Sequence, residues 1–194
     1  MTSFQLKDGA WQVEELPLAD IATRFGTPTY VYSRSALENA LAEYQQTLAA
    51  HPAGKDGLVC FSIKSNSNLA ILNLFARMGA GFDIVSGGEL QRALAAGADA
   101  SKIVFSGVGK SASEMHQALE ADIFCFNVES APELERLNEI AVAMGKKAPI
   151  SLRVNPNVDP KTHPYISTGL KEAKFGVPHD RARALYRRAT SLPG

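Results

Sequence analysis

The chain has 194 residues, with 20 Lys and Arg against 20 Asp and Glu, and 45% of its residues are hydrophobic. This composition is typical of a globular protein of one or two domains and excludes a disordered or fibrous chain. A net charge of zero with scattered basic residues lacks the positive surface that nucleic-acid phosphates or anionic lipids require, so neither is expected as a partner.

Residues 1–28 are expected to form an N-terminal extension outside the main domain, because they carry Trp11 and two prolines before any regular pattern begins. Charged residues occur throughout the first 20 positions, which excludes the apolar core of a signal peptide. No later stretch approaches the roughly 20 apolar residues of a membrane span. We therefore expect a cytoplasmic protein with no membrane partner.

Residues 29–194 alternate short apolar runs with longer segments of helical period, which is typical of parallel strands joined by helices. The runs are mostly apolar at successive positions, as in strands buried on both faces. Serine followed three residues later by glutamate predicts helix starts at Ser35, Ser111 and Ser130. The predicted strands are 29–33, 58–64, 81–85, 103–106, 123–128 and 150–155.

The ends of the last five strands, near residues 64, 85, 106, 128 and 155, are spaced by 21, 21, 22 and 27 residues, about one strand, one helix and two turns. This regular spacing favours a (β/α) barrel of the TIM type. The alternative is an open doubly wound sheet, but the G-x-G-x-x-G fingerprint expected after its first strand is absent. A complete eight-unit barrel takes about 250 residues. We therefore expect residues 29–194 to form a partial (β/α)8 barrel of five to six units, truncated before closure.

Lys64 is the first candidate for chemistry, because it ends the apolar strand 58–64. The C-terminal strand ends of a parallel barrel converge on its active-site face. A lysine held there can act as a nucleophile toward a carbonyl group, whereas most lysines are solvated surface charges.

Three sequence runs resemble the diaminopimelate decarboxylases, which are pyridoxal-phosphate enzymes of the alanine racemase-like, fold-type III barrel class. The runs are F-S-I-K-S-N-S-N at 61–68, G-A-G-F-D-I-V-S-G-G-E-L at 79–90 and R-V-N-P-N-V-D-P-K-T-H-P-Y-I-S-T-G-L-K-E-A-K-F-G at 153–176. The resemblance covers nearly the whole chain, and the third run is the most specific. Ser62 departs from the alanine or proline usual in relatives.

The resemblance implies that Lys64 binds the aldehyde of pyridoxal 5'-phosphate covalently. It also implies that Asp83 holds the lysine ammonium or orients the cofactor; the alternative is a carboxylate that caps the turn at 86–88. Arg153 either approaches the cofactor or forms a salt bridge inside the barrel, since a buried guanidinium must be paired. His163 is expected to order a loop at the mouth of the site, and Lys174 is a weaker candidate for the same site.

Several other motifs are interpreted as structural. The segment 106–111 ends like a phosphate-binding Walker A loop, but Val104 occupies the place of its first glycine. The four histidines show no metal-ligand spacing, so no metal site is expected. Cys60 and Cys125 lie in strand-like runs and are expected to be reduced thiols.

The resemblance implies that the complete enzyme converts meso-diaminopimelate to L-lysine and carbon dioxide as a homodimer. Residues for the cofactor phosphate, the ring nitrogen and the substrate carboxylate are expected beyond residue 194, so the chain alone is expected to be inactive and to self-associate. Three alternatives remain: a single-domain pyridoxal-phosphate homeostasis protein, a decarboxylase of ornithine, arginine or carboxynorspermidine, and a non-enzymatic fragment.

Overall fold

The computed structural model describes residues 3–158, 161 and 175–194 of the chain. These residues form two compact units, Met1–Val59 and Cys60–Gly194, and each is described by itself. The expected separation of an extension at 1–28 from a barrel domain at 29–194 stays a prediction.

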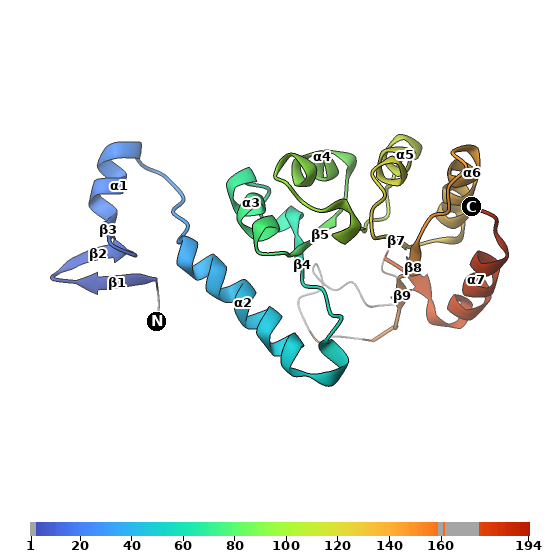
Figure 1. Cartoon of the computed structure of the whole chain (residues 1–194), viewed down its shortest axis with the longest axis horizontal. Helices are drawn as coiled ribbons and strands as arrows, with labels where there is room; N and C mark the ends of the chain where they lie inside the picture. Colours follow the sequence, from blue (N-terminus) through green and yellow to red (C-terminus); the bar gives the residue numbers. More distant parts are fainter. Residues whose placement is uncertain (1–2, 159–160, 162–174) are drawn as a thin grey trace. The chain divides into compact units, whose positions relative to one another are not determined.

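The N-terminal unit contains a small antiparallel sheet that was not predicted from the sequence. Its strands β1 (Phe4–Lys7), β2 (Ala10–Val13) and β3 (Leu16–Pro17) follow one another in space, and helix α1 (Leu18–Phe25) packs on β2 and β3 (Figure 1). Asp8 and Gly9 both have positive φ, of 51° and 77°, as the tight turn between β1 and β2 requires. Helix α2 (Arg34–Ala50) and a 3₁₀ turn at Pro52–Gly54 complete the unit.

Two predictions for this unit were wrong. Residues 29–33 form no strand, because no other described strand offers them a hydrogen-bonding partner and strand propensity alone does not make a ladder. Helix α2 begins at Ser33 rather than Ser35: the Ser33 hydroxyl accepts the Ala36 N–H at 3.0 Å. The Ser33 hydroxyl and the Ser35 N–H both donate to the Glu14 carboxylate at 2.8 Å, which ties the start of α2 to the residue after β2.

The second unit is built on a five-stranded sheet, all of whose neighbouring strands are parallel. In spatial and chain order the strands are β4 (Cys60–Ser62), β5 (Gly81–Ile84), β6 (Ile103–Phe105), β7 (Cys125–Val128) and β8 (Ile150–Leu152). Each lies within a predicted strand. The predicted parallel α/β class is confirmed, and the described strands do not close into a barrel.

Four helices follow one another along one side of this sheet (Figure 1). They are α3 (Leu69–Arg77), α4 (Gly87–Ala95), α5 (Ala112–Glu120) and α6 (Ala131–Ala143). The predicted capping box of Ser111 and Glu114 is present in full at α5. Ser130 caps α6 as predicted, but the Glu133 carboxylate accepts the N–H of Glu129, one residue before the cap.

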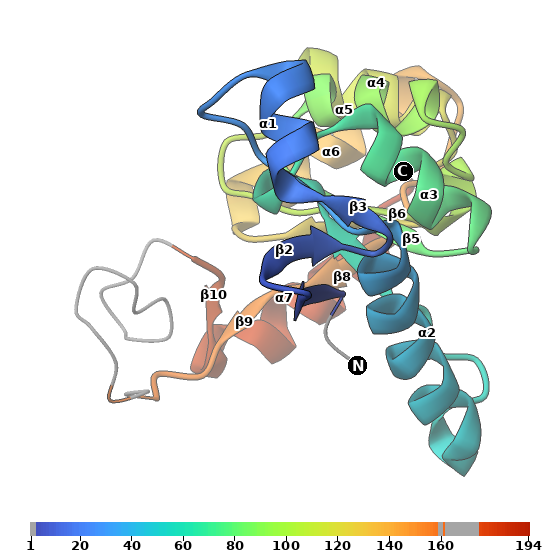
Figure 2. The same cartoon turned by 90° about the vertical axis from the view of Figure 1, so that its left-hand side faces the viewer.

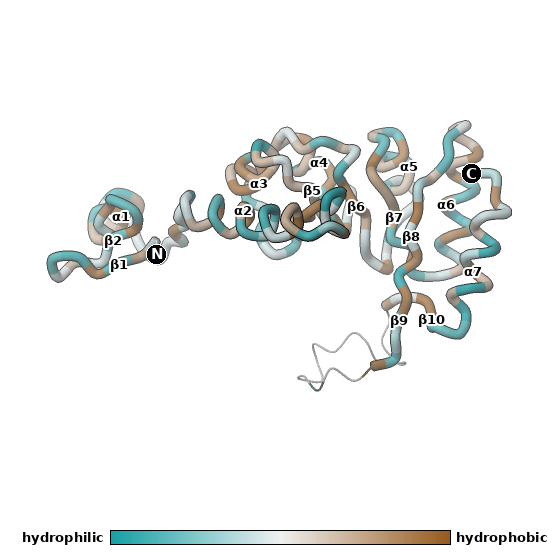
Figure 3. Tube along the Cα trace, turned by 60° about the horizontal axis from the view of Figure 1, so that its bottom comes forward, coloured by the Kyte–Doolittle hydropathy of each residue, from teal (hydrophilic) through white to brown (hydrophobic). Residues whose placement is uncertain are grey.

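The predicted strand 150–155 is divided at Arg153 into β8 and a short strand β9 (Val154–Asn155). Strand β9 pairs in parallel with β10 (Val177–Pro178), and the two lie side by side in Figure 2. Helix α7 (His179–Ser191) follows β10 and is largely hydrophilic along its trace in Figure 3. Short 3₁₀ turns occur at Ile63–Ser65 and Ala100–Lys102.

The sheet has two chemically different faces. Alternate side chains are fully buried in the apolar core: Phe82, Ile84, Ile103, Phe105, Phe126 and Val128 each have an exposed fraction of 0%. The intervening positions carry small or polar side chains that are half-buried or exposed: Cys60, Ser62, Asp83, Val104, Cys125, Asn127 and Ser151. The expectation of strands that are apolar on both faces was therefore wrong, since only the face toward the helices is uniformly apolar.

Candidate active site

Lys64 lies in the 3₁₀ turn Ile63–Ser65, directly after β4. The turn contacts β5, so Lys64 is at the C-terminal edge of the parallel sheet, where the sequence placed it. Its side chain is exposed, and its ammonium makes no hydrogen bond or ion pair with any residue that the structure describes. A primary amine at this edge is therefore available to a ligand.

Asp83 lies on β5 directly opposite Ser62 on β4. The Ser62 hydroxyl donates to Asp83 Oδ2 at 3.2 Å, and the Ser106 hydroxyl donates to Oδ1 at 2.5 Å. The alternative role as a cap of the turn at 86–88 is not what the carboxylate does: the Ser86 hydroxyl caps α4 by accepting the N–H of Glu89. The Asp83 carboxylate instead accepts hydrogen bonds from Ser62 on β4 and from Ser106, the residue that follows β6.

The hydrogen bonds continue across the sheet beyond Ser106. The Asn127 amide on β7 donates to Ser106 Oγ at 2.9 Å, and the Ser151 hydroxyl on β8 donates to Asn127 Oδ1. None of these three residues was predicted to be functional. The alternation of apolar and polar residues in C-F-N-V at 125–128 was the available signal.

Arg153 follows β8 and forms an ion pair with Glu129, with 3.1 Å between the guanidinium and Oε1. The side chain of Glu129 is 2% exposed, whereas that of Arg153 is 39% exposed. The guanidinium carbon also lies 4.7 Å from the ring centroid of Phe175. Of the two roles expected for Arg153, the structure contains the salt bridge. An approach of Arg153 to a cofactor stays a prediction.

The Glu129 carboxylate has further partners. It accepts the backbone N–H groups of Gly107 at 2.9 Å and Gly176 at 3.2 Å. Glu129 thus connects the end of β7 with the loop after β6 and with the residue before β10. This network holds together the segments that follow β6, β7 and β8 at the C-terminal edge of the sheet.

Lys110, the lysine of the Walker-like segment, points into the protein. Its side chain has no exposed area, and its ammonium donates to the carbonyls of Gly107 and Asn127 and to the Glu133 carboxylate, at 2.7–2.8 Å. All three protons of the ammonium are used by internal acceptors. Lys110 is therefore a buried connection between the start of α5 and the start of α6.

Cys60 and Cys125 are free thiols on the polar face of the sheet. Burial raises the pKa of both, and for Cys60 the nearby Asp83 carboxylate and the Cys125 thiol raise it further. No group of three His, Cys, Asp or Glu side chains that could hold a metal ion occurs within the described ranges. The predicted site residues His163 and Lys174 lie outside the described residues.

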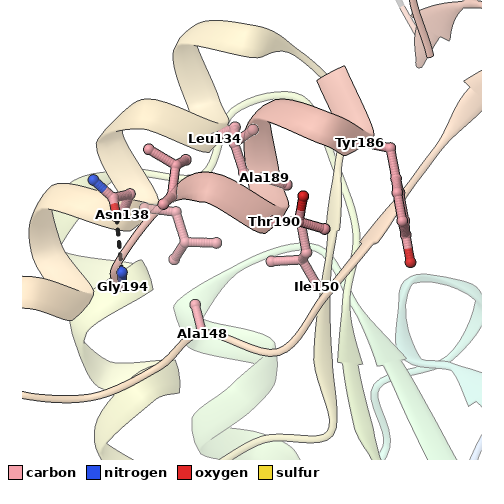
Figure 4. A pocket seen from close by; sticks show the side chains of 10 residues that line it. Leu134, Asn138, Ala148, Ile150, Tyr186, Ala189, Thr190 and Gly194 are labelled. Carbon is pink, nitrogen blue, oxygen red and sulfur yellow. Dashed lines mark hydrogen bonds between the residues drawn. The ribbon is translucent and has the colours of Figure 1, made fainter. Parts of the chain in front are cut away.

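A cavity of about 150 Å³ lies away from these residues, between α6, α7 and the sheet edge at Ile150 (Figure 4). Most of its lining is apolar, and the Gly194 N–H donates to Asn138 Oδ1 at its rim at 2.9 Å. It contains neither Lys64 nor Asp83. We therefore assign the candidate site to the sheet edge at Lys64.

The amino-acid sequence of the chain is similar to those of a known family of enzymes. Residues 34–193 match the family model described as "Pyridoxal-dependent decarboxylase, pyridoxal binding domain". Diaminopimelate decarboxylase of Vibrio cholerae is 57% identical over 187 residues, which are 96% of this chain and 44% of that protein. The diaminopimelate decarboxylase of Pseudomonas aeruginosa is also 57% identical, over 99% of this chain and 45% of its own length.

A solved structure extends the similarity to three dimensions. The crystal structure of diaminopimelate decarboxylase from Helicobacter pylori complexed with L-lysine aligns with a TM-score of 0.86 and 45% identity, over 91% of this chain and 44% of that one. The chain spans about half the length of the curated relatives it matches. None of the helices among the described residues is both long and apolar enough to cross a membrane.

Proposed function

The chain belongs to the pyridoxal-dependent decarboxylases, and from this membership we propose that it is the cofactor-binding part of a diaminopimelate decarboxylase. The observation that carries the proposal is 57% identity to curated diaminopimelate decarboxylases over nearly the whole chain. Because the chain spans less than half of each of these two proteins, the activity is proposed for the longer protein that contains it.

The residues at the sheet edge fit pyridoxal 5'-phosphate in their chemistry. The cofactor has an aldehyde that condenses with a primary amine, and Lys64 offers an amine without a partner among the residues described. Asp83, held by two serine hydroxyls, offers a fixed carboxylate within the same part of the sheet. We propose that Lys64 attaches the cofactor and that Asp83 orients the lysine or the cofactor.

Bound pyridoxal phosphate supplies the electron sink that a decarboxylation needs, because its ring accepts the electron pair left when carbon dioxide departs. The residues of this chain supply position and charge. In the proposed roles, the Lys64 amine would hold the cofactor through its aldehyde. Asp83 keeps a negative charge near the reacting nitrogen, and the Arg153–Glu129 pair keeps the loops after the strands in place.

The proposed reaction is the conversion of meso-diaminopimelate to L-lysine and carbon dioxide. Among the structural neighbours, the Helicobacter pylori enzyme was solved with L-lysine, which supports an amino-acid ligand of this kind. We also propose that the complete enzyme is a homodimer in the cytoplasm and that the present chain alone does not turn over substrate. An amino acid other than diaminopimelate is the second candidate, since decarboxylases of arginine share the fold.

Cofactor attachment is tested by adding pyridoxal phosphate to the chain and to the full-length gene product, reducing with borohydride, and mapping the labelled peptide. We expect the label on Lys64 and its loss in Lys64→Ala. Lys147→Ala is the matched control, because Lys147 is also exposed but lies in the segment between α6 and β8. Equal labelling of the parent and Lys64→Ala would contradict the proposed role of Lys64.

Substrate choice is tested by turnover of the full-length gene product with meso-diaminopimelate, ornithine and arginine as separate substrates. We expect carbon dioxide and L-lysine from the first and little reaction with the others. Preference for ornithine or arginine would replace the proposed substrate but leave the decarboxylase assignment in place. Sedimentation of the same protein tests the proposed dimer.

A further inference from the structure

A chain of hydrogen bonds crosses the polar face of the sheet and converges on Asp83. We call it the polar chain; its members are Ser151, Asn127, Ser106, Asp83 and Ser62. Four of them lie on β8, β7, β5 and β4, and Ser106 is the residue directly after β6. The polar chain therefore spans the full width of the five-stranded sheet.

The direction of each hydrogen bond follows from its neighbours. The Asn127 carbonyl oxygen accepts the Ser151 hydroxyl, so the amide NH₂ faces Ser106 and donates to its oxygen at 2.9 Å. A serine hydroxyl has a single proton, and that of Ser106 is directed to Asp83 Oδ1. The hydrogen bond from Ser151 therefore orients the Asn127 amide, which in turn orients the Ser106 hydroxyl toward the Asp83 carboxylate.

Asp83 is the end point of the polar chain from both sides. It accepts Ser106 on Oδ1 and Ser62 on Oδ2, which is the pattern of a carboxylate that acts only as an acceptor. Because one donor lies on β4 and the other directly after β6, they fix both the position and the plane of the carboxylate. A freely rotating aspartate on a half-buried sheet face would have no such preferred direction.

Lys64 lies within reach of this fixed charge. It follows Ser62, the register partner of Asp83, by two residues, and two residues span at most about 7 Å of chain. The turn that contains Lys64 contacts β5, the strand of Asp83. The flexible four-carbon side chain of the lysine can bring its amine to the carboxylate.

We propose that Ser106, oriented by Asn127, is a positioning residue that holds the Asp83 carboxylate beside the Lys64 amine and so promotes attachment of the cofactor aldehyde at this lysine. The inference rests on the proposed function. Attachment joins the lysine nitrogen to the aldehyde carbon and releases the aldehyde oxygen as water, with hydrogens from the neutral amine. As the carbon–oxygen bond breaks, positive charge develops on the nitrogen, and a fixed carboxylate stabilises it.

The test compares Ser106→Thr with Ser106→Val in the chain and in the full-length gene product. Threonine keeps the hydroxyl, and valine has nearly the same volume without it. With pyridoxal phosphate and borohydride trapping, we expect Ser106→Thr to retain the parent's initial rate of labelling at Lys64. We expect the initial rate of labelling at Lys64 to be about tenfold lower in Ser106→Val, which is the effect of losing one hydrogen bond to a charged group. Labelling at Lys147 serves as the internal reference for the amount of reagent and protein. Thermal unfolding of each variant shows whether a lower ratio of Lys64 to Lys147 comes from a loss of structure instead.

Asn127→Ala is the second variant, since it leaves Ser106 and Asp83 in place but removes the group that orients the hydroxyl. We expect its Lys64-to-Lys147 ratio to fall below that of the parent, and this result decides the matter if Ser106→Val does not fold. Equal ratios in the threonine and valine variants, or a parent-like ratio in Asn127→Ala, would overturn the positioning role. Absence of label on Lys64 in the parent would instead overturn the proposed function.

Discussion

Glu129 and Arg153 form an ion pair across the ends of β7 and β8, in which the carboxylate is buried and the guanidinium is partly exposed. The carboxylate also accepts two backbone N–H groups, from Gly107 and Gly176. Since the three donors belong to three different segments, the ion pair is one part of a junction that holds the C-terminal edge of the sheet together. The segments that follow β6, β7 and β8 are therefore held by one buried carboxylate.

Glu129→Gln is expected to lower the free energy of unfolding by about 2–3 kcal/mol, because it leaves a partly buried guanidinium without its counter-charge and turns an amide donor toward backbone N–H groups. Glu135→Gln is the control, since Glu135 pairs with Arg188 on the surface and exposed pairs contribute little. Urea denaturation measures both variants. If Glu129→Gln lowered the free energy of unfolding no more than Glu135→Gln does, the stabilising role of the Glu129 contacts would be contradicted.

Lys110→Met should destabilise the second unit by about 3 kcal/mol or more, because the buried Glu133 carboxylate loses its cation and two carbonyls lose a donor. The double variant Lys110→Met with Glu133→Leu should recover part of the loss, since it removes the unpaired buried charge as well. Thermal unfolding of the single and double variants measures the recovery. A double variant less stable than Lys110→Met would show that the carboxylate does not need this lysine.

The lowered pKa of Glu114 leads us to expect that the stability of the fold depends on pH. The Gly87 N–H, the Ser111 N–H and the Ser111 hydroxyl all donate to its carboxylate and hold its pKa below the usual 4.5. A carboxyl with a lower pKa in the folded state stabilises the fold above its unfolded pKa, and this contribution is lost as pH falls through the folded value. We expect Glu114→Gln to be less stable than the parent at pH 7, with the difference shrinking below pH 4.5. Denaturation midpoints from pH 7 to pH 3 provide the measurement, and a difference independent of pH would contradict it.

Gly176→Ala tests the close approach of β9 and β10. Gly176 has a φ of +77°, and an added Cβ would lie 2.9 Å from the Arg153 carbonyl oxygen. Gly145→Ala is the matched control, because Gly145 also has a positive φ, of +64°, but open space around the same position. We expect about 1 kcal/mol of destabilisation for Gly145→Ala from backbone strain alone and a larger loss for Gly176→Ala. Equal losses would mean that the backbone near Arg153 moves away without cost.

The two thiols should react slowly with disulfide reagents, because the thiolate is the reactive form and burial raises the pKa of both. In Cys125→Ser, which leaves Cys60 alone, we expect the pH at half-maximal reaction rate to lie above that of a small thiol, whose pKa is about 8.5. Cys60→Ser gives the corresponding profile for Cys125. A midpoint at or below that of the small thiol would contradict the raised pKa.

The parallel strands were predictable because each combines apolar residues with a regular spacing of about one strand and one helix. The N-terminal sheet was not predicted, since its strands have no uniform apolar run and its side chains are largely exposed. The start of α2 was predicted at Ser35, whereas the structure has it at Ser33. Both serines precede the same apolar pattern, and they differ only in their contacts with Glu14, which binds the Ser33 hydroxyl and the Ser35 N–H.

Within the candidate site, Lys64 was located by its place at the end of an apolar run, and Asp83 was identified through the family resemblance. It did not identify the partners of Asp83. Ser106 lies directly after β6 and Asn127 lies on β7, and their hydrogen bonds depend on the register between strands, which a pattern along one strand does not contain. The buried partners of Lys110 were missed for the same reason.

The order of the strands in the sheet bears on how the second unit is assembled during synthesis. In the five-stranded sheet each strand after β4 pairs with the strand that precedes it in the chain. The hydrogen bond from Lys110 to Glu133 and that from Gly107 to Glu129 also join consecutive β/α segments. Contacts between nearby segments cost little loop-closure entropy, so a chain leaving the ribosome can add one strand and one helix at a time without waiting for its far end. Proteolysis of ribosome-stalled chains of increasing length should therefore show protection that grows in steps of about one β/α repeat.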